Sequence, residues 1–517
     1  MTSNAVVTPH HLSARAGRII FEKGGNAVDA AVAAVAAQGV VAPETCGIGG
    51  DLFALVHAPG WDRPRCLNSS GRAGSGASSA DLRSAGHDSI PLDHPFVATV
   101  PGCVDGMETL VTELGSLSLA EVLAPAIELA RDGFEVSTEQ AGAFGRQAPV
   151  YATNPAVRDF YPGGRPVARG EHVTRFDLAT TLEDIGNGGR EAFYGGRAGE
   201  DIAAAVGGMI TMTDLEASIA EWVDPIGVPA AGLTAWTTPP NTQGYLGPAT
   251  ISVFEMLEPP NDPDDPTWWH LLIEAYRCLA WERNDLVADP DHVSLPVHLL
   301  MSPDRLARAA ESVDRDAAGK WPDRVGALAG TAYLCVADAE GMAVSIIQSN
   351  YRGTGSPFGA ARSGFLLQDR GLGFTLTPGH PNELAPGKRP LHTLSPTLWT
   401  DENGPRWILG TRGGSVQPQL IAQMAARAIL TGQPVADAQK APRWTVSDFG
   451  PNSAPKPALE PATPSGVIES LRDKGHEVAV TDGPQPGWGP VSIIELEGDV
   501  RRAAADPRVD TTSALVF

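Results

Sequence analysis

The stretch GALAGTAYLCVADAEGMAVS, residues 326–345, places a threonine directly behind a leader of small residues. Residues 331–337 (TAYLCVA) read as a strand, and the turn-forming residues 338–341 (DAEG) connect them to a second apolar run, AVSIIQS. This pattern predicts a β-hairpin that begins at Thr331. Thr331 is explained either by the strand propensity of a β-branched residue or by a chemical role, and the rest of the chain has to decide.

Composition bounds the possible functions. The chain has 517 residues, 42% of them hydrophobic and 19% charged, as expected of a folded globular protein. Its net charge of −23 argues against nucleic acid or an anionic membrane as a partner, although a few local arginines can still bind a small anion. The five cysteines form no CxxC pair, and the twelve histidines show no metal-ligand spacing. We therefore expect no metal and no cofactor.

The N-terminal region predicts a protein without a membrane segment. Residues 1–17 lack a basic segment followed by an apolar core, so no export signal is expected and the predicted location is cytoplasmic. The most apolar run, residues 26–43, is interrupted by Asp29, Gln38 and Gly39. With Asn26 as a cap, this run predicts an alanine-rich buried helix.

Helical patterns dominate the first part of the chain and strands the last part. Helices are expected within residues 107–134 (two, with a kink or break at Pro125), 198–222 (two, joined by a turn), 267–286, 303–312 and 415–431. Residues 313–330 read as an exposed linker, and strands are expected at 331–337, 343–349, 363–368, 395–400 and 406–410. The predicted fold class is α+β, with a layered αββα arrangement.

Common catalytic motifs are missing from the sequence, which contains no HExxH, no P-loop and no GxSxG. A threonine at a new N-terminus needs none of them. If the Gly330–Thr331 bond were cut, the α-amino group, with a pKa near ~8, would lie beside the threonine hydroxyl and act as its general base. The hydroxyl could also cut the chain itself by attacking the Gly330 carbonyl.

A series of motifs spans the chain in a specific order and spacing: KGGNAVDAAVAA, CGIGGD, VATVPGCVDGMETL, LAPAIELARDGFEV, PPNTQGYLGP, EAYRCLAWERNDLVADP, TAYLCVADAEGMAVS, PGHPNELAPGKRPLHTLSPTL and LGTRGGS. In these the chain resembles the γ-glutamyltransferase (γ-glutamyltranspeptidase) family. The resemblance implies a four-layer αββα N-terminal-nucleophile hydrolase, made as a precursor that cuts itself before Thr331. Residues 1–330 would form the large subunit and residues 331–517 the small subunit of one composite domain. The two subunits would stay associated as a heterodimer. Whether two such heterodimers form a larger dimer is not decided by the resemblance.

Further roles carry over by position from the resemblance. Gly413 and Gly414 match the family's oxyanion-hole glycines, and a glycine pair between a strand and a helix can aim backbone amides at a developing oxyanion. His392 and Thr393 stand where the family has two serines that contact the substrate carboxylate. Ser349 or Gln348 matches a threonine that supports the nucleophile's amine. Asn350 matches a substrate-contacting asparagine.

Several positions depart from the family pattern. Leu372 and Gly373 replace the acid pair that binds the substrate α-ammonium; Asp369 could substitute, but the adjacent Arg370 would repel an ammonium. The carboxylate-binding arginine is displaced to Arg72, and Arg412 stands where the family usually has proline, so Arg72, Arg370 and Arg412 are all candidate anion contacts. These departures resemble a divergent branch that includes oxamate amidohydrolase.

The expected function is hydrolysis or transfer of a small acidic amide through a Thr331 acyl-enzyme. γ-Glutamyl amides are the first expectation, and oxamate-like or glutaryl-like amides are the alternative. A third alternative is an inactive binding protein on the same scaffold. Retention of Thr331, Ser349, Asn350 and the Gly413–Gly414 pair argues against it.

Overall fold

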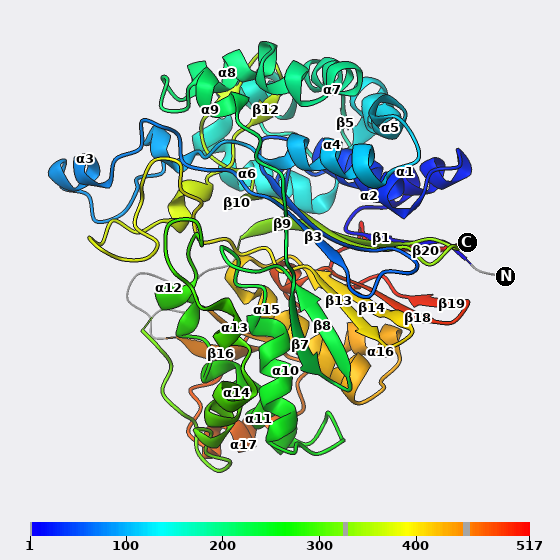
Figure 1. Ribbon diagram of the computed structural model, residues 1–517, viewed down its shortest axis with the longest axis vertical. Helices are drawn as coiled ribbons and strands as arrows, with labels where there is room; N and C mark the ends of the chain where they lie inside the picture. Colours follow the sequence, from blue (N-terminus) through cyan, green and yellow to red (C-terminus); the bar gives the residue numbers. More distant parts are fainter. Residues whose placement is uncertain (1–2, 324–328, 448–454) are drawn as a thin grey trace.

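The computed structural model describes residues 3–323, 329–447 and 455–517. Two β-sheets lie face to face between two layers of helices, so the order of layers is α, β, β, α from top to bottom in Figure 1. This confirms the αββα arrangement expected from the sequence. Residues 324–328 of the expected linker lie outside the described residues.

The first sheet contains the hairpin predicted around Thr331. Its seven strands are ordered β20 (Ser513–Val516), β1 (Ala5–Thr8), β9 (Gly330–Ala337), β10 (Ala343–Tyr351), β2 (Asp51–His57), β3 (Arg65–Ser69) and β6 (Glu221–Val223). Strands β9 and β10 pair antiparallel from Ala337↔Ala343 to Ala332↔Gln348, and the register then shifts so that Gly330 lies opposite Tyr351. The hairpin is therefore central in the sheet and carries a bulge at the end that contains Thr331.

The second sheet packs on the first through apolar side chains of both. Its six strands are ordered β19 (Val500–Ala503), β18 (Val491–Glu497), β14 (Gly404–Thr411), β13 (Thr397–Asp401), β8 (Leu233–Thr237) and β7 (Ile226–Ala230). Tyr333 and Ile347 of the first sheet share one buried cluster with Leu398 and Ile408 of the second. Because β14 packs against β9, the end of β14 lies close to the start of the hairpin.

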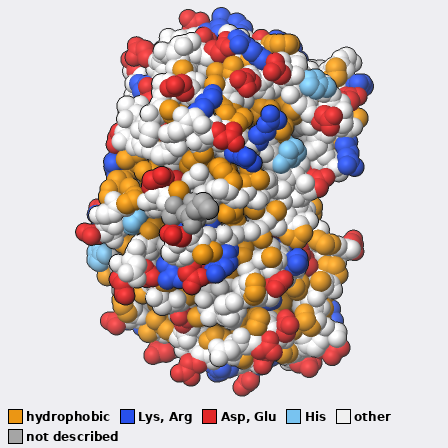
Figure 2. Space-filling model, turned by 90° about the vertical axis from the view of Figure 1, so that its right-hand side faces the viewer, with side chains coloured by type: hydrophobic (Ala, Val, Ile, Leu, Met, Phe, Trp, Pro, Cys, Tyr) orange, Lys and Arg blue, Asp and Glu red, His pale blue; other side chains and the backbone are white. Residues whose placement is uncertain are grey.

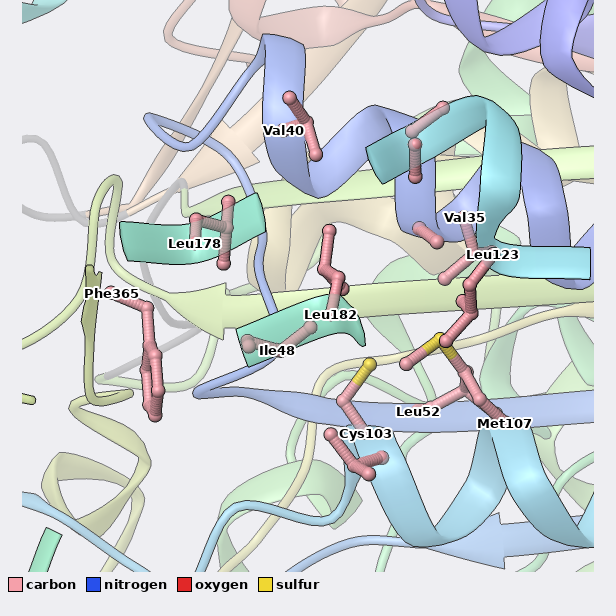
Figure 3. Close-up of a cluster of buried hydrophobic side chains, with 14 of the residues drawn as sticks. Val35, Val40, Ile48, Leu52, Cys103, Met107, Leu123, Leu178, Leu182 and Phe365 are labelled. Atoms are coloured by element: carbon pink, nitrogen blue, oxygen red, sulfur yellow. The ribbon is translucent and has the colours of Figure 1, made fainter. Parts of the chain in front are cut away.

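Helices of the N-terminal part cover the outer face of the first sheet. They are α1 (His11–Glu22), α2 (Ala27–Val41), α4 (Cys103–Leu114), α5 (Leu119–Asp132), α6 (Thr138–Tyr151), α7 (Phe176–Tyr194), α8 (Arg197–Ala205) and α9 (Met212–Glu216). Helix α2 is buried at every residue and starts at the capping box of Asn26 and Asp29, as predicted. Figure 3 shows side chains of α2, α4, α5 and α7 that belong to one buried apolar cluster with Leu52 of β2.

The other outer layer consists of α10 (Leu246–Met256), α11 (Pro266–Arg277), α12 (Glu282–Leu286), α13 (Val297–Leu300), α14 (Pro303–Glu311), α15 (Gln417–Met424), α16 (Val435–Lys440) and α17 (Ser465–Asp473). Shorter elements are α3 (Ser79–Ser84), β4 (Phe134–Glu135), β5 (His172–Val173), β11 (Gly359–Ala360), β12 (Phe365–Leu366), β15 (Trp444–Ser447), β16 (Lys456–Leu459) and β17 (Ala479–Val480).

Four sequence expectations about these elements were wrong in detail. Helix α5 runs unbroken through Pro125, and the helix expected at 267–286 is split into α11 and α12. The second helix expected in 198–222 is the short α9, after which the chain enters β6, because residues 221–223 pair with β3. The strand expected at 363–368 is reduced to β12.

Both sheets contain strands from the two sides of the Gly330–Thr331 junction. Strand β9 lies between β1 and β10, β10 pairs with β2, and β13 pairs with β8. The chain ends also meet, since Asn4 and Phe517 exchange backbone hydrogen bonds. On the face shown in Figure 2, acidic and basic side chains are interspersed. Among the described residues, no helix is long and apolar enough to cross a membrane.

Candidate active site

The Gly330–Thr331 bond lies at the first residues of β9, in contact with several hydroxyl groups. The Thr331 hydroxyl donates to the Gly330 carbonyl oxygen at an O–O distance of 2.6 Å, and its Oγ1 lies 3.4 Å from the Ser349 Oγ. Thr331 is buried, whereas Gly330 is partly exposed. A side chain at residue 330 would collide with the backbone of Gly353, since an added Cβ would lie 2.9 Å from its Cα. The close approach of these two backbones therefore requires glycine at position 330.

The structure distinguishes Ser349 from Gln348 as the neighbour of Thr331. The Ser349 hydroxyl donates to the Gly330 carbonyl at 2.8 Å. The Gln348 side chain points to the helical layer, where its amide group contacts the Cys103 Sγ at 2.8 Å. Because adjacent residues of a strand face opposite sides of the sheet, only Ser349 of these two can reach the Gly330–Thr331 bond.

Arg370 is the most unusual charged group near Thr331. Its side chain is fully buried, with Nη1 3.1 Å from the Thr393 Oγ1 and Nη2 3.1 Å from the Ser349 Oγ. The Tyr351 ring covers one face of the guanidinium at 4.2 Å. Among the described residues no carboxylate lies within ion-pair distance of this guanidinium, although the charges of Asp51 and Asp369 act on it, and its Nε has no hydrogen-bond partner. Burial lowers the pKa of Arg370 to about 10, so it stays charged at neutral pH.

His392 is held by Asp51 as a neutral ring. The two side chains are fully buried, with Nε2 of the histidine 3.1 Å from Oδ2 of the aspartate. The Leu394 N–H donates to Nδ1, so Nε2 carries the proton and donates to Asp51. Burial, reinforced by the charge of Arg370, lowers the pKa of His392 to about 4. Both ring nitrogens of His392 are thus already hydrogen-bonded within the protein. Of the predicted pair His392 and Thr393, it is Thr393 that is hydrogen-bonded to Arg370.

Gly413 and Gly414 form the turn between β14 and α15. Their φ angles are 129° and 58°, a region that side-chain-bearing residues rarely adopt. The Gln243 Nε2 donates to the Gly414 carbonyl at 3.1 Å and to the Thr393 carbonyl at 3.2 Å. This amide links the glycine turn to the segment that contacts Arg370.

Three predicted substrate contacts, Asn350, Arg72 and Arg412, do not join the side chains that surround Thr331. Asn350 donates to the Thr354 carbonyl and lines a small cavity under the helical layer. Arg72 forms ion pairs with three carboxylates, those of Glu221, Asp289 and Asp291. Arg412 donates to the carbonyls of residues 486 and 489 and pairs with Glu139 of α6 at 2.7 Å. Arg72 and Arg412 are therefore already neutralised by protein carboxylates.

Sequence reasoning missed three residues that shape the site, namely Asp51, Tyr351 and Gln243. Asp51 ends the motif CGIGGD and Gln243 lies in PPNTQGYLGP, so both stood in segments that carried the resemblance. Tyr351 has a φ of 80°, a backbone feature without a sequence signal. Among the described residues, no cluster of three His, Cys, Asp or Glu side chains is arranged to hold a metal ion.

Comparisons with known proteins show the family to which the chain belongs. The family model described as Gamma-glutamyltranspeptidase matches residues 13–516. The chain is 34% identical to the glutathione hydrolase-like YwrD proenzyme of Bacillus subtilis (98% of each chain covered). It is 33% identical to the oxamate amidohydrolase proenzyme of Klebsiella pneumoniae (99% of this chain and 98% of the relative). The structure of cephalosporin acylase from Bacillus halodurans superimposes with a TM-score of 0.92 at 31% identity, covering 99% of this chain and 96% of that one. The chain belongs to the gamma-glutamyltranspeptidase family, with the N-terminal-nucleophile hydrolase fold.

Proposed function

We propose that this chain is a self-processing amidohydrolase whose acyl substrate carries a carboxylate and lacks an α-ammonium group. The observation that carries this proposal is the buried guanidinium of Arg370, which has no carboxylate partner among the described residues. An unpaired buried charge costs several kcal/mol. Asp51 and Asp369 act on this charge only from beyond ion-pair distance, so a substrate carboxylate near Thr393 and Ser349 would supply a direct counter-charge and place the acyl group beside Thr331.

Maturation supplies the nucleophile. Cleavage of the Gly330–Thr331 bond gives Thr331 a free amine, which takes the proton of its own hydroxyl while the oxygen attacks the substrate amide carbon. The amides of Gly413 and Gly414 stabilise the oxyanion, the amine product leaves with the transferred proton, and water hydrolyses the acyl ester. Ser349 supports the Thr331 amine. The two fragments stay associated because their strands are hydrogen-bonded to one another in both sheets.

The charge of Arg370 disfavours a γ-glutamyl group. An ammonium about 5 Å from a guanidinium costs roughly 3 kcal/mol at an effective dielectric constant near 20. That energy corresponds to about a hundredfold in binding. The geometry therefore favours the glutaryl-like or oxamate-like alternative over γ-glutamyl amides, and two of the relatives are named for oxamate and cephalosporin substrates.

γ-Glutamyl hydrolysis or transfer remains the second candidate because of Asp369. Its Oδ1 accepts from the Arg352 N–H at 2.9 Å, but its buried Oδ2 has no hydrogen-bond partner among the described residues. Burial raises the pKa of Asp369 to about 6, so most of it is ionised at neutral pH. This oxygen could receive an α-ammonium.

The test compares kcat/KM of the processed protein for glutaryl and γ-glutamyl p-nitroanilides and for oxamate. The proposal expects the glutaryl compound or oxamate to react at least as well as the γ-glutamyl compound. A strong γ-glutamyl preference that disappears in Asp369→Asn would establish the second candidate instead. No turnover of any of the three amides by fully processed protein would overturn both.

A further inference from the structure

The hydroxyl group of Ser349 has a fixed orientation in the uncut chain. Its oxygen accepts two hydrogen bonds, from the Arg370 Nη2 at 3.1 Å and from the Tyr351 N–H at 2.8 Å. A serine hydroxyl has one proton and two acceptor lone pairs. Since both lone pairs are engaged, the proton points to the Gly330 carbonyl oxygen at 2.8 Å, which is nearer than the Thr331 Oγ1 at 3.4 Å.

Tyr351 holds this arrangement through both its backbone and its ring. It lies opposite Gly330 at the bulge of the hairpin, and its φ of 80° is rare for a bulky residue. Such backbone strain persists where surrounding structure enforces it and is concentrated at functional sites. Here it directs the N–H at Ser349, while the ring covers the Arg370 guanidinium at 4.2 Å.

We propose that Arg370 promotes the self-cleavage of the Gly330–Thr331 bond as a positioning residue that acts through Ser349. This role is additional to binding an acyl carboxylate, and it rests on the proposed cleavage site. The cation donates to the Ser349 oxygen, which makes the serine hydroxyl a stronger donor to the scissile carbonyl. The site is buried, so the charge of Arg370 is weakly screened.

The cleavage proceeds in two balanced steps. The Thr331 Oγ1 bonds to the Gly330 carbonyl carbon, and the carbonyl electron pair moves to the oxygen, where negative charge develops against the Ser349 hydroxyl. The C–N bond then breaks, and the hydroxyl proton of Thr331 ends on its new amine, leaving an ester. Water adds to the ester carbon and the C–O bond breaks. One proton of the water restores the Thr331 hydroxyl, the other passes to the Thr331 amine, and Gly330 is released as a carboxylate.

Cleavage rates in newly made chains test this role without any substrate. Pulse-labelled precursor from cell-free translation is followed over time on denaturing gels, with mass spectrometry to locate the cut. We expect Arg370→Met and Ser349→Ala each to slow cleavage at least tenfold, since loss of one oxyanion donor costs about 100-fold or more in comparable sites. Arg370→Lys and Ser349→Thr, which keep the charge and the hydroxyl, should recover most of the rate.

Arg427→Met is the matched control. Arg427 is also buried, lies over the rings of Trp268 and Trp269, and has its pKa lowered to about 10 by burial. It contacts the α11 region rather than Thr331, so this variant should mature at the wild-type rate. Slowing in Arg427→Met equal to that in Arg370→Met would assign the effect to general destabilisation and overturn the inference.

The double variant Arg370→Met/Ser349→Ala separates a relay from two independent effects. If Arg370 acts through Ser349, the double variant should cleave no more slowly than Ser349→Ala alone. Multiplied effects, or wild-type cleavage in Arg370→Met, would overturn this inference alone. A wild-type chain that is cut elsewhere, or not at all, would overturn the proposed function as well.

Discussion

The Nη1 atom of Arg370 lies 3.1 Å from the Oγ1 atom of Thr393. This contact joins the turn that follows β12 to the segment that precedes β13, and both belong to residues 331–517. Asp51, from the portion of the chain before the Gly330–Thr331 junction, also stabilises the contact between Arg370 and Thr393. Its carboxylate is hydrogen-bonded to His392, the residue next to Thr393. Arg370 and its contacts Ser349, Tyr351 and Thr393 lie in the same part of the chain as Thr331. From the portion before the junction, Asp51 acts on this group through His392.

Replacing the nucleophile should stop both maturation and turnover. In Thr331→Ala no hydroxyl is available to attack the Gly330 carbonyl, so a single band should remain on a denaturing gel and no amide should be hydrolysed. Thr331→Ser, which keeps the hydroxyl, should still be cut. Edman sequencing of the small wild-type fragment should begin TAYLCV. Another N-terminus, or an uncut chain with full activity, would contradict the assignment of Thr331.

Local sequence patterns predicted the hairpin and most helices, but not the composition of the sheets. The turn residues at 338–341 and their apolar flanks act over short range, and the predicted hairpin is β9–β10. Strands β1 and β3 are short and become strands through partners far away in sequence, as in the pairing of β1 with β20. Residues 221–223 show the same effect, since pairing with β3 overrides a helical pattern.

Only part of the candidate site could be predicted, because some of its contacts also join residues that are far apart in the sequence. Thr331, Ser349, Arg370 and Thr393 are in contact with one another, as the sequence led us to expect of a single site. The position of Arg72 could not be predicted, because its carboxylate partners lie 149 to 219 residues later in the chain. Asn350 was misplaced because a strand alternates its side chains, and the sequence does not reveal which face meets the site.

The glycine pair should be sensitive to any side chain. A Cβ on Gly413 would lie 3.0 Å from the Val416 Cγ2, and the φ angles of both glycines are unfavourable for other residues. Gly414→Val or Gly413→Val should therefore displace the amides and cost on the order of 2.7–4 kcal/mol of transition-state stabilisation, mainly in kcat. Gly432→Ala is the control, since Gly432 also has a positive φ but its Cβ would meet open space. Normal kcat in processed Gly414→Val would place the oxyanion hole elsewhere.

The ion pair between Arg412 and Glu139 should support catalysis without binding substrate. It connects helix α6 to the residue that precedes the glycine pair, and the Arg412 side chain is 7% exposed. We expect Glu139→Gln and Arg412→Gln to lower kcat by about 10- to 100-fold through displacement of the turn, with little change in KM. Arg502→Gln, which removes an exposed ion pair, should leave both parameters unchanged. A rise in KM with unchanged kcat would instead make Arg412 a substrate contact.

Glu44, which lies near this ion pair, should make stability depend on pH. Burial, together with the negative charge of Glu139, raises the pKa of Glu44 from 4.5 to about 8. The folded protein therefore retains a proton that the unfolded chain releases above pH 4.5, and the stabilisation from this group is lost as pH rises through 8. Glu44→Gln removes the titration, so its free energy of unfolding relative to the parent should rise by about 1 kcal/mol per pH unit between pH 5 and 8.

Urea unfolding at several pH values measures this difference, with Thr331→Ala as the parent so that each sample is one uncut chain. The Gln140 Nε2 lies 3.4 Å from the Glu44 carboxylate and can still be satisfied by the glutamine, which keeps the substitution close to isosteric. Parallel stability curves for the parent and the Glu44→Gln variant would show that Glu44 is already ionised in the folded protein. In that case Arg412 would neutralise Glu44 as well as Glu139, and Glu44→Gln should lower kcat as Glu139→Gln does.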